Sequence, residues 1–215
     1  MSSYAPVSAP VCYVHADDHL IVIDKPSGLL SVPGRGEAKA DCAITRVQAD
    51  YADALTVHRL DMDTSGLLLL ARGKEMQRVL SGLFERGKVE KAYIADVWGV
   101  PEPAQGEIDL PLITDWPARP RQKVDAEHGK PSRTHYETLA ASGDAARLWL
   151  TPLTGRSHQL RVHLASIGHP ILGDPLYAHD DALARRPRLA LHAGRLAFMH
   201  PALGERVVFE AECPF

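Results

Sequence analysis

Cysteines and long apolar segments are scarce in this sequence. Its 215 residues include three cysteines, too few and too widely spaced for a disulfide framework or a Cys-x-x-Cys metal site. No segment approaches the roughly 20 consecutive apolar residues of a membrane-spanning helix. The first residues also lack the charged-then-apolar pattern of a secretory signal. We therefore expect a protein of the reducing cytoplasm that does not bind membranes.

Motifs that bind metals or common cofactors are also missing. The 11 histidines include no His-Glu-x-x-His pair, and the zinc-deaminase pattern of His-x-Glu followed by Pro-Cys-x-x-Cys is absent. His158 and His163 are five residues apart, which does not place them squarely on one face of a helix. The chain has no phosphate-binding P-loop, no dinucleotide-binding glycine pattern and no Gly-x-Ser-x-Gly nucleophile turn. We predict neither a metal nor an organic cofactor.

A general excess of positive charge is absent too. The chain has 24 Lys and Arg against 27 Asp and Glu, for a net charge of −3. Non-specific binding to phosphate backbones usually depends on a basic excess. The basic residues are grouped, however, and the densest group lies within fifteen residues that contain only two acids. Its members are Arg119, Arg121, Lys123, Lys130 and Arg133. They form either a solvated loop or a local phosphate-binding surface.

What is present is the composition of an ordinary globular protein, 45% hydrophobic and 24% charged. Hydrophobic periodicity predicts strands at 19–25, 67–70, 89–100 and 146–153. It predicts helices at 41–51 with Asp41 as the cap, at 74–86, and at 157–167 with Ser157 as the cap. Residues 189–210 are predicted to form a hairpin. Because these elements do not alternate as regular βαβ units, we expect an α+β fold with a mixed, largely antiparallel sheet and flanking helices.

Two segments do not follow these periodic patterns. Residues 1–11 are rich in proline and small residues, and we expect them to form a flexible arm. Residues 101–131 are rich in proline, glycine and charge, and they predict long loops that form a binding surface. A chain of this length can form one large domain or two small ones. We expect residues 12–215 to form a single domain.

The most informative stretch is His58-Arg-Leu-Asp61-Met-Asp-Thr-Ser-Gly66, followed by four leucines. Four leucines bounded by a glycine predict a buried strand, and a strand in the core holds the loop that leads into it. An aspartate at Asp61 would then be held rigidly, as a catalytic carboxylate must be. Spacing alone favours a turn residue at Asp61 with Arg59 as its surface partner, and Asp63 is interpreted as a turn residue.

This stretch resembles the catalytic motif of the RluA family of RNA pseudouridine synthases. Further blocks resemble later motifs of the family in the same order, and together they span roughly residues 20 to 210. These blocks are Lys91-Ala-Tyr93, the stretch from Thr154 to His163, Gly168 to Asp174 with Tyr177, and Leu189 to Ala193. Residues 30–35 and 109–117 resemble one branch in particular, whose members modify both transfer RNA and large-subunit ribosomal RNA. The resemblance implies the pseudouridine synthase catalytic fold, without a separate N-terminal RNA-binding domain.

The resemblance also implies roles for individual residues. The reaction breaks the glycosidic C–N bond of uridine, turns the base and rejoins it through carbon, with no net gain or loss of atoms. Asp61 would attack the nucleotide or remove a proton from it. Arg161 would keep Asp61 ionised, and Arg59 would fill the space of a flipped base. Tyr93 and Leu191 would contact that base, although pattern alone favours a core tyrosine at 93 and a surface arginine at 161.

We therefore expect a cofactor-free, monomeric enzyme that isomerises uridines in RNA hairpin loops. Its expected partners are transfer RNA and ribosomal RNA hairpins, with the basic group from Arg119 to Arg133 on their phosphates. Two alternatives stay open. One is an RNA-binding module without catalysis. The other is a hydrolase or nuclease in which Asp61, Asp63 and a divalent ion cut RNA.

Overall fold

The leucine run after the Thr-Ser-Gly turn forms the predicted strand β4 (Ser65–Arg72). All four leucines are fully buried. Because successive side chains of a strand point to opposite faces, both faces of β4 are covered by protein. The computed structural model describes residues 4–215 and divides into two compact units, which are described separately below. Unit 1 comprises residues 1–91 and 193–214, and unit 2 comprises residues 92–192 with Phe215.

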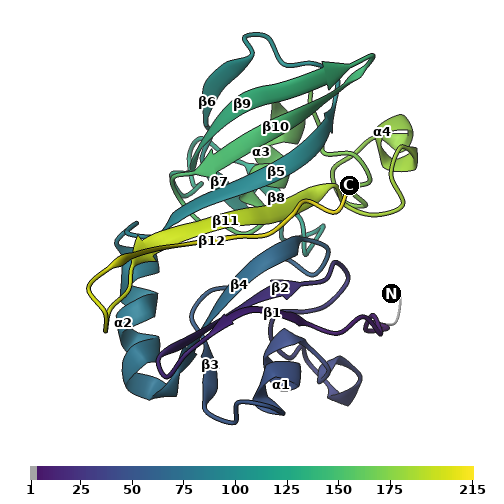
Figure 1. Ribbon diagram of the computed structural model, residues 1–215. Helices are drawn as coiled ribbons and strands as arrows, with labels where there is room; N and C mark the ends of the chain where they lie inside the picture. Colours follow the sequence, from purple (N-terminus) through teal and green to yellow (C-terminus); the bar gives the residue numbers. More distant parts are fainter. Residues whose placement is uncertain (1–3) are drawn as a thin grey trace. The chain divides into compact units, whose positions relative to one another are not determined.

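Unit 1 is built on a sheet around β4, in which the β1–β2, β2–β4, β3–β4 and β11–β12 pairs are antiparallel. The strand order is β1-β2-β4-β11, with β3 beside β4 and β12 beside β11. The strands are β1 (Cys12–Ala16), β2 (Leu20–Lys25), β3 (Ala54–Thr56), β11 (Leu191–Met199) and β12 (Arg206–Glu210). Helix α2 (Gly73–Glu85) is labelled in Figure 1. Its Leu80 belongs to the same buried cluster as Leu67 and Leu69 of β4, which forms the core of this unit. The unit also contains helix α1 (Ala43–Gln48) and a short 3-10 helix at Glu37–Lys39.

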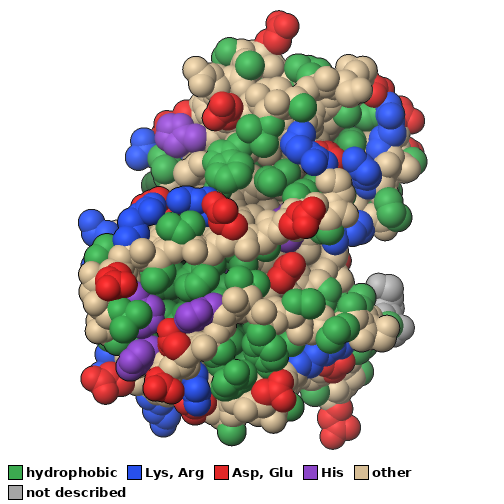
Figure 2. Space-filling model, viewed as in Figure 1, with side chains coloured by type: hydrophobic (Ala, Val, Ile, Leu, Met, Phe, Trp, Pro, Cys, Tyr) green, Lys and Arg blue, Asp and Glu red, His purple; other side chains and the backbone are tan. Residues whose placement is uncertain are grey.

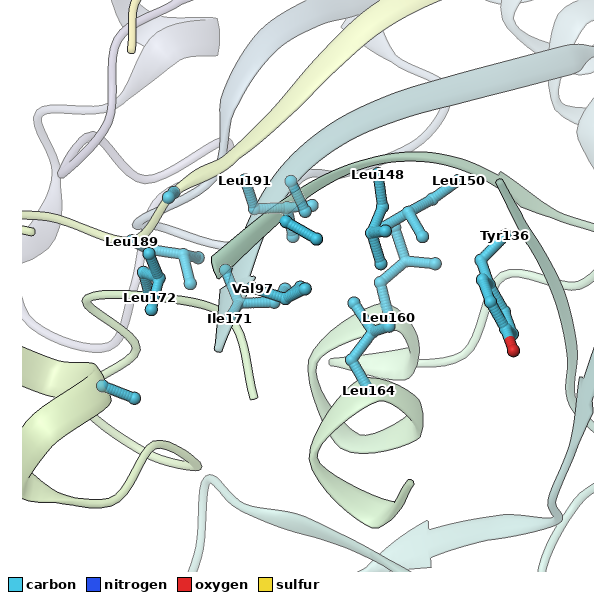
Figure 3. Close-up of a cluster of buried hydrophobic side chains, with 14 of the residues drawn as sticks. Val97, Tyr136, Leu148, Leu150, Leu160, Leu164, Ile171, Leu172, Leu189 and Leu191 are labelled. Carbon is cyan, nitrogen blue, oxygen red and sulfur yellow. The ribbon is translucent and has the colours of Figure 1, made fainter. Parts of the chain in front are cut away.

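Unit 2 is built on a second run of antiparallel strands, in the order β5-β10-β9-β6. These strands are β5 (Glu90–Trp98), β6 (Gln105–Asp109), β9 (Arg133–Ser142) and β10 (Ala145–Pro152). A separate hairpin is formed by β7 (Leu112–Thr114) and β8 (Gln122–Val124). Helix α3 (Gln159–Ser166) covers one sheet face, and Leu160 and Leu164 point toward Leu148 and Leu150 of β10 (Figure 3). Each buried leucine of this core contributes roughly 1.5–3 kcal/mol.

The α+β fold with a largely antiparallel sheet and flanking helices is confirmed, as are the predicted strands and hairpin. The helix caps were wrong. Helix α1 is capped by Cys42 through a capping box with Thr45, whereas Asp41 forms an ion pair with Arg46. Helix α3 is preceded by His158 rather than Ser157, and no side chain caps it. Caps depend on backbone angles that the residue type alone does not determine.

The region 101–131 was predicted as long loops, but it contains the strands β6, β7 and β8. The sequence pattern did not reveal them because they are short, and Ile108 and Leu112 are their only buried residues. The strands β1, β3 and β9 and helix α4 (Asp180–Ala184) were also not predicted. Strand β9 alternates exposed and buried residues over its first half, and its hydrogen-bonded neighbours β6 and β10 hold it in the sheet.

Part of the predicted flexible arm, residues 1–3, lies outside the described residues. Residues 4–11 form no helix or strand, and they are hydrogen-bonded to unit 1. Arg46 donates to the carbonyls of Val7 and Ala9, and the Tyr4 hydroxyl donates to the carbonyl of Asp41. The flexibility of the arm and the single domain at 12–215 stay predictions. Within residues 4–215, none of the helices has the length and apolar character that crossing a membrane requires.

Candidate active site

Asp61 lies in the connection between β3 and β4, directly before a turn at Met62 and Asp63. The turn is closed by a hydrogen bond of 3.2 Å from the Thr64 N–H to the Asp61 carbonyl. Asp61 is half-buried, and Asp63 is a turn residue, as the sequence predicted. The carboxylate is therefore near the surface on a loop whose far end enters the buried strand β4.

A buried lysine anchors this loop. The Lys25 side chain is 0% exposed, and its ammonium donates to the carbonyls of Pro26 (2.9 Å), Leu29 (2.7 Å) and Met62 (3.0 Å). A buried ammonium is costly unless hydrogen bonds replace its hydration, and three carbonyl acceptors do so here. One of these acceptors belongs to Met62, the residue after Asp61, so Lys25 holds the backbone of the loop in place.

Two serines close to Lys25 in the sequence also form hydrogen bonds with the backbone of this loop. The Ser31 hydroxyl donates to the Leu60 carbonyl at 2.8 Å and accepts from the Leu60 N–H at 3.1 Å. The Ser27 hydroxyl donates to the Asp63 carbonyl at 2.6 Å. The anchoring roles of Lys25, Ser27 and Ser31 were not predicted, because Lys25 was interpreted only as the end of a strand. A lysine at the end of an otherwise apolar strand is the signal that would have identified it.

His58 holds the beginning of the loop. Its Nε2 accepts a hydrogen bond of 3.0 Å from the backbone N–H of Leu69, and its ring stacks on Phe84 with centroids 4.3 Å apart. Burial, and secondarily the charge of Lys91, lowers the pKa of His58 to about 3. The imidazole is therefore neutral near pH 7, with its proton on Nδ1. Burial also lowers the pKa of Lys91.

The glycine of the Thr-Ser-Gly sequence is required for a steric reason. Gly66 has a φ of 111°, and a Cβ atom there would lie 2.4 Å from the carbonyl oxygen of Ala193. Any other residue would push β4 away from β11. Arg59, between His58 and Asp61 in sequence, is exposed. An exposed arginine beside Asp61 is compatible with the predicted stacking role, which stays a prediction.

In unit 2, Arg161 lies on α3 and is 2% exposed, so it is not a surface residue. Its Nε and Nη2 donate to the two oxygens of Asp174 at 2.8 and 2.7 Å. Asp174 also accepts the backbone N–H groups of Leu176 (2.8 Å) and Tyr177 (3.2 Å). The bidentate pair fixes the plane of the guanidinium. The role of Arg161 toward Asp61 stays a prediction.

A second glycine allows this arrangement. Gly173 precedes Asp174 and has a φ of 70°. A Cβ atom on Gly173 would lie 2.0 Å from the carbonyl oxygen of Arg188. The backbones of Gly173 and Arg188 therefore lie too close together for any residue with a Cβ atom at position 173. This close approach places Asp174 next to Arg161.

Tyr177 connects Arg161 to the β7–β8 hairpin. Its hydroxyl accepts the Gln122 N–H at 2.8 Å and lies 2.7 Å from Nδ1 of His158. The Arg161 and Arg121 guanidinium groups lie 5.2 and 5.4 Å from the centre of its ring. His158 has a φ of 54°, the only positive value of a non-glycine residue within 4–215. Such backbone conformations concentrate at functional sites.

Tyr93 and Leu191 both belong to the core of unit 2. Tyr93 lies on β5 opposite Leu150 of β10 and is partly buried against this core. Leu191 is 3% exposed at the beginning of β11 and packs in the same core (Figure 3). Their contacts with a flipped base stay predictions.

The polar residues of the third block support the fold of unit 2. Gln159 accepts from Thr154 (2.7 Å) and donates to Thr134 (3.0 Å). His163 is fully buried between the Leu110 carbonyl and the Thr134 hydroxyl, each at 3.0 Å. Burial lowers the pKa of His163, so its ring is neutral near pH 7. These two side chains hold α3 against β9, a structural role that the sequence analysis missed.

All five predicted RNA-binding residues are exposed. Lys123 lies on β8, and Arg119 and Arg121 lie in the connection between β7 and β8. Lys130 precedes β9, where Arg133 lies 3.7 Å from Glu107 of β6. On the face that Figure 2 shows, Lys and Arg are interspersed with Asp and Glu.

The predicted site residues fall in both units: Arg59 and Asp61 in unit 1, and Tyr93, Arg161 and Leu191 in unit 2. Within residues 4–215, no three His, Cys, Asp or Glu side chains are grouped so that they could hold a metal ion.

Comparison with known proteins identifies close relatives. The family model described as RNA pseudouridylate synthase matches residues 19–166. The chain is 51% identical over 217 aligned residues to the dual-specificity RNA pseudouridine synthase RluA of Escherichia coli K12, covering 100% of this chain and 99% of that protein. It is 51% identical to the enzyme of the same name from Pasteurella multocida, covering 99% of this chain and 98% of that protein.

Two solved structures are similar to the chain. Human RNA Pseudouridylate Synthase Domain Containing 1 has a TM-score of 0.78 and 26% identity, covering 95% of this chain and 84% of that one. Human RNA Pseudouridylate Synthase Domain Containing 4 has a TM-score of 0.75 and 28% identity, covering 94% and 88%.

Proposed function

Because this chain belongs to the RNA pseudouridylate synthase family, we propose that it isomerises uridines in hairpin loops of both transfer RNA and large-subunit ribosomal RNA. The observation that carries the dual specificity is the 51% identity, over the whole chain, to enzymes named as dual-specificity RNA pseudouridine synthases. The branch-like blocks at residues 30–35 and 109–117 support the same substrates.

In this proposal Asp61 is the essential carboxylate. The glycosidic C–N bond breaks, a C–C bond forms between the same sugar and the turned base, and the proton lost from carbon is balanced by one gained on nitrogen. An ionised carboxylate at a fixed position can open this path as a nucleophile or as a base. The support comes from the loop itself, because Lys25, Ser27 and Ser31 hold its backbone on both sides of Asp61.

The other predicted site residues act on the flipped nucleotide. Arg161 provides the positive charge that keeps Asp61 ionised, and its pairing with Asp174 orients the guanidinium before RNA binds. Tyr93 stacks on the target base, and Leu191 forms the apolar wall beside it. Arg59 occupies the space that the base leaves, which lowers the cost of extracting it.

The remaining proposals concern the enzyme as a whole. Residues 12–215 act as one catalytic domain made of both units, with residues 1–11 as its flexible arm. The enzyme acts as a monomer, since one chain carries every proposed site residue. It acts in the cytoplasm, where free cysteines stay reduced and where transfer RNA and ribosomal RNA are found.

The decisive experiment is pseudouridine mapping on total RNA from cells with and without this protein. Loss of pseudouridine at positions in both transfer RNA and large-subunit ribosomal RNA is expected. In vitro, an isolated anticodon stem-loop should be a substrate, and a ribosomal hairpin should compete with it. An unchanged map would contradict the proposal. RNA binding without isomerisation, or chelator-sensitive cleavage, would favour the two alternative functions.

A further inference from the structure

The tip of the β7–β8 hairpin carries an exposed tryptophan. Trp116 is 65% exposed, the highest value among the large hydrophobic side chains that the structure describes. Tryptophan usually buries most of its large apolar surface in a core or an interface. Trp116 therefore presents apolar surface to solvent at a place where it contributes little to the folding of unit 2.

An arginine covers part of this ring. The guanidinium of Arg119 lies 4.5 Å from the centre of the Trp116 ring. This cation–π contact orients the indole, and it places a positive charge directly beside the aromatic surface. The chain between Trp116 and Lys123 contains three basic and no acidic residues. An aromatic ring with several neighbouring cations fits an unpaired nucleotide, whose base stacks and whose phosphates are neutralised.

The tip is also held in a defined shape. The N–H of Asp115 donates to the Arg121 carbonyl at 3.0 Å, and the N–H of Ala118 donates back to the Asp115 carbonyl at 3.1 Å. Below the tip, Tyr177 accepts the N–H of Gln122 and so ties β8 to the segment that follows Asp174. A preorganised ring loses less conformational entropy on binding than a mobile one.

We propose that Trp116, with Arg119 stacked on it, is a base-stacking platform for an unpaired nucleotide of the RNA substrate, other than the uridine that is isomerised. This inference rests on the proposed function for the identity of the RNA. It adds a contact for a base to a hairpin whose charged residues alone would contact only phosphates. Such a contact selects loops in which a second base is free to stack.

The test compares equilibrium binding of a labelled anticodon stem-loop to wild type and to Trp116→Leu, Trp116→Phe and Trp149→Leu. Trp116→Leu should weaken binding about 5- to 150-fold, the range for one lost base stack. Trp116→Phe should retain most of the affinity because it keeps an aromatic face. Trp149→Leu is the matched control, since Trp149 lies partly exposed on β10, away from the hairpin. Equal affinity of wild type and Trp116→Leu would overturn the proposal.

A second measurement separates stacking from general effects. Hairpins with one abasic loop nucleotide are tested in turn with wild type and Trp116→Leu. At one position, other than the target uridine, the abasic RNA should bind both proteins equally, because the stacked base is already missing. A uniform loss at every position would overturn the stacking role. The slope of binding against salt should not change, since no phosphate contact is removed.

The outcome is independent of catalysis. In turnover assays Trp116→Leu should raise KM for the RNA by about the same factor as Kd, because Trp116 positions RNA without touching the reacting atoms. If wild type forms no pseudouridine but the binding results hold, the proposed function fails and the platform stands. If wild type is active and Trp116→Leu binds RNA with wild-type affinity, only the proposal of a stacking platform is contradicted. An unchanged melting temperature of Trp116→Leu confirms that the variant is folded.

Discussion

The loop that carries Asp61 and the hairpin that carries Arg119 both connect strands, but they are held in place by different means. The loop is fixed by buried side chains, with Lys25 and Ser31 bonded to its backbone. The hairpin is fixed mainly by backbone hydrogen bonds and by Tyr177, and the side chains of Trp116, Arg119 and Arg121 at its tip are exposed.

This difference matches the role that is proposed for each region. A reacting carboxylate must be positioned to within a fraction of an ångström, which requires anchors that do not themselves move. A surface that meets a long polyanion gains more from reach and charge, since phosphate contacts tolerate small displacements. Changes in the loop should therefore affect turnover and stability, and changes in the hairpin should affect affinity.

The largest effect is expected from Asp61→Asn. The neutral amide is a far weaker nucleophile or base, so turnover should fall at least about 1000-fold, with fold and RNA affinity retained. Single-turnover assays and binding measurements on the same preparation test this. Asp63→Asn is the matched control and should stay active. Substantial activity of Asp61→Asn would remove Asp61 from the reaction.

Lys25→Met should remove the hydrogen bonds that the Lys25 ammonium donates to the loop carrying Asp61. The substitution keeps the apolar stem but removes the ammonium from the carbonyls of Pro26, Leu29 and Met62, of which Met62 keeps the N–H of Gly28, so the free energy of unfolding should fall by roughly 3 kcal/mol. Turnover should fall as well, because Met62 is released beside Asp61. Urea denaturation of Lys25→Met measures the loss, with Lys88→Met as an exposed control. Wild-type stability of Lys25→Met would show that the ammonium does not anchor the loop.

Neutralising the hairpin should change RNA affinity without changing stability. Replacing Arg119, Arg121 and Lys123 by Gln removes about three phosphate contacts, so the slope of log Kd against log salt should fall by roughly 2 to 3. Binding titrations over a range of salt concentrations measure this slope.

The matched control for this triple change removes three exposed cations of unit 1, namely Lys74, Arg78 and Lys88. Their replacement by Gln should leave the slope nearly unchanged. A similar decrease in both triple variants would show that RNA contacts are not concentrated on the hairpin.

The smallest effect concerns His58 and pH. Its folded pKa is lowered to about 3, mainly by burial, whereas an unfolded histidine has a pKa near 6.5. As pH falls below 6.5, the unfolded chain gains a proton that the folded chain does not accept until about pH 3. This group therefore lowers stability on acidification by about 1 kcal/mol per pH unit between roughly pH 6 and 4, and has no such effect above 6.5.

His58→Gln should remove this part of the pH dependence. Urea denaturation at several pH values should show a shallower decrease for His58→Gln than for wild type. His128→Gln, at an exposed position, should follow the wild-type curve. Parallel curves for His58→Gln and wild type would mean that His58 is accessible to protons in the folded state.

Much of the molecule could be predicted from local pattern. The four leucines of β4 and the apolar positions of α2 are periodic over segments long enough to determine the element type. The turn at Asp61 follows from its position before a buried strand. Motif resemblance then identified the family, because several blocks occur together in the right order.

The residues that hold Asp61 in place depend on contacts between distant parts of the chain. Lys25 and Met62 are 37 residues apart, and Arg161 and Asp174 are 13 apart, so no local pattern links them. Most residues of strands β6 and β9 are exposed, and β9 alternates exposed and buried residues only over its first half. Hydrogen bonding between the two strands is what holds them in the extended conformation. Resemblance identified Arg161, but only the tertiary structure showed it buried against Asp174.

The sequence by itself thus determined the family and the α+β class, because local periodicity and motif order are properties of the sequence, and it predicted Asp61 as the carboxylate. The tertiary structure decided which side chains anchor that carboxylate and which cations stay exposed. The physical reason is that burial and hydrogen-bond partners are set where distant segments meet. A lysine at position 25 or a tryptophan at position 116 acquires its role only from the neighbours that folding brings to it.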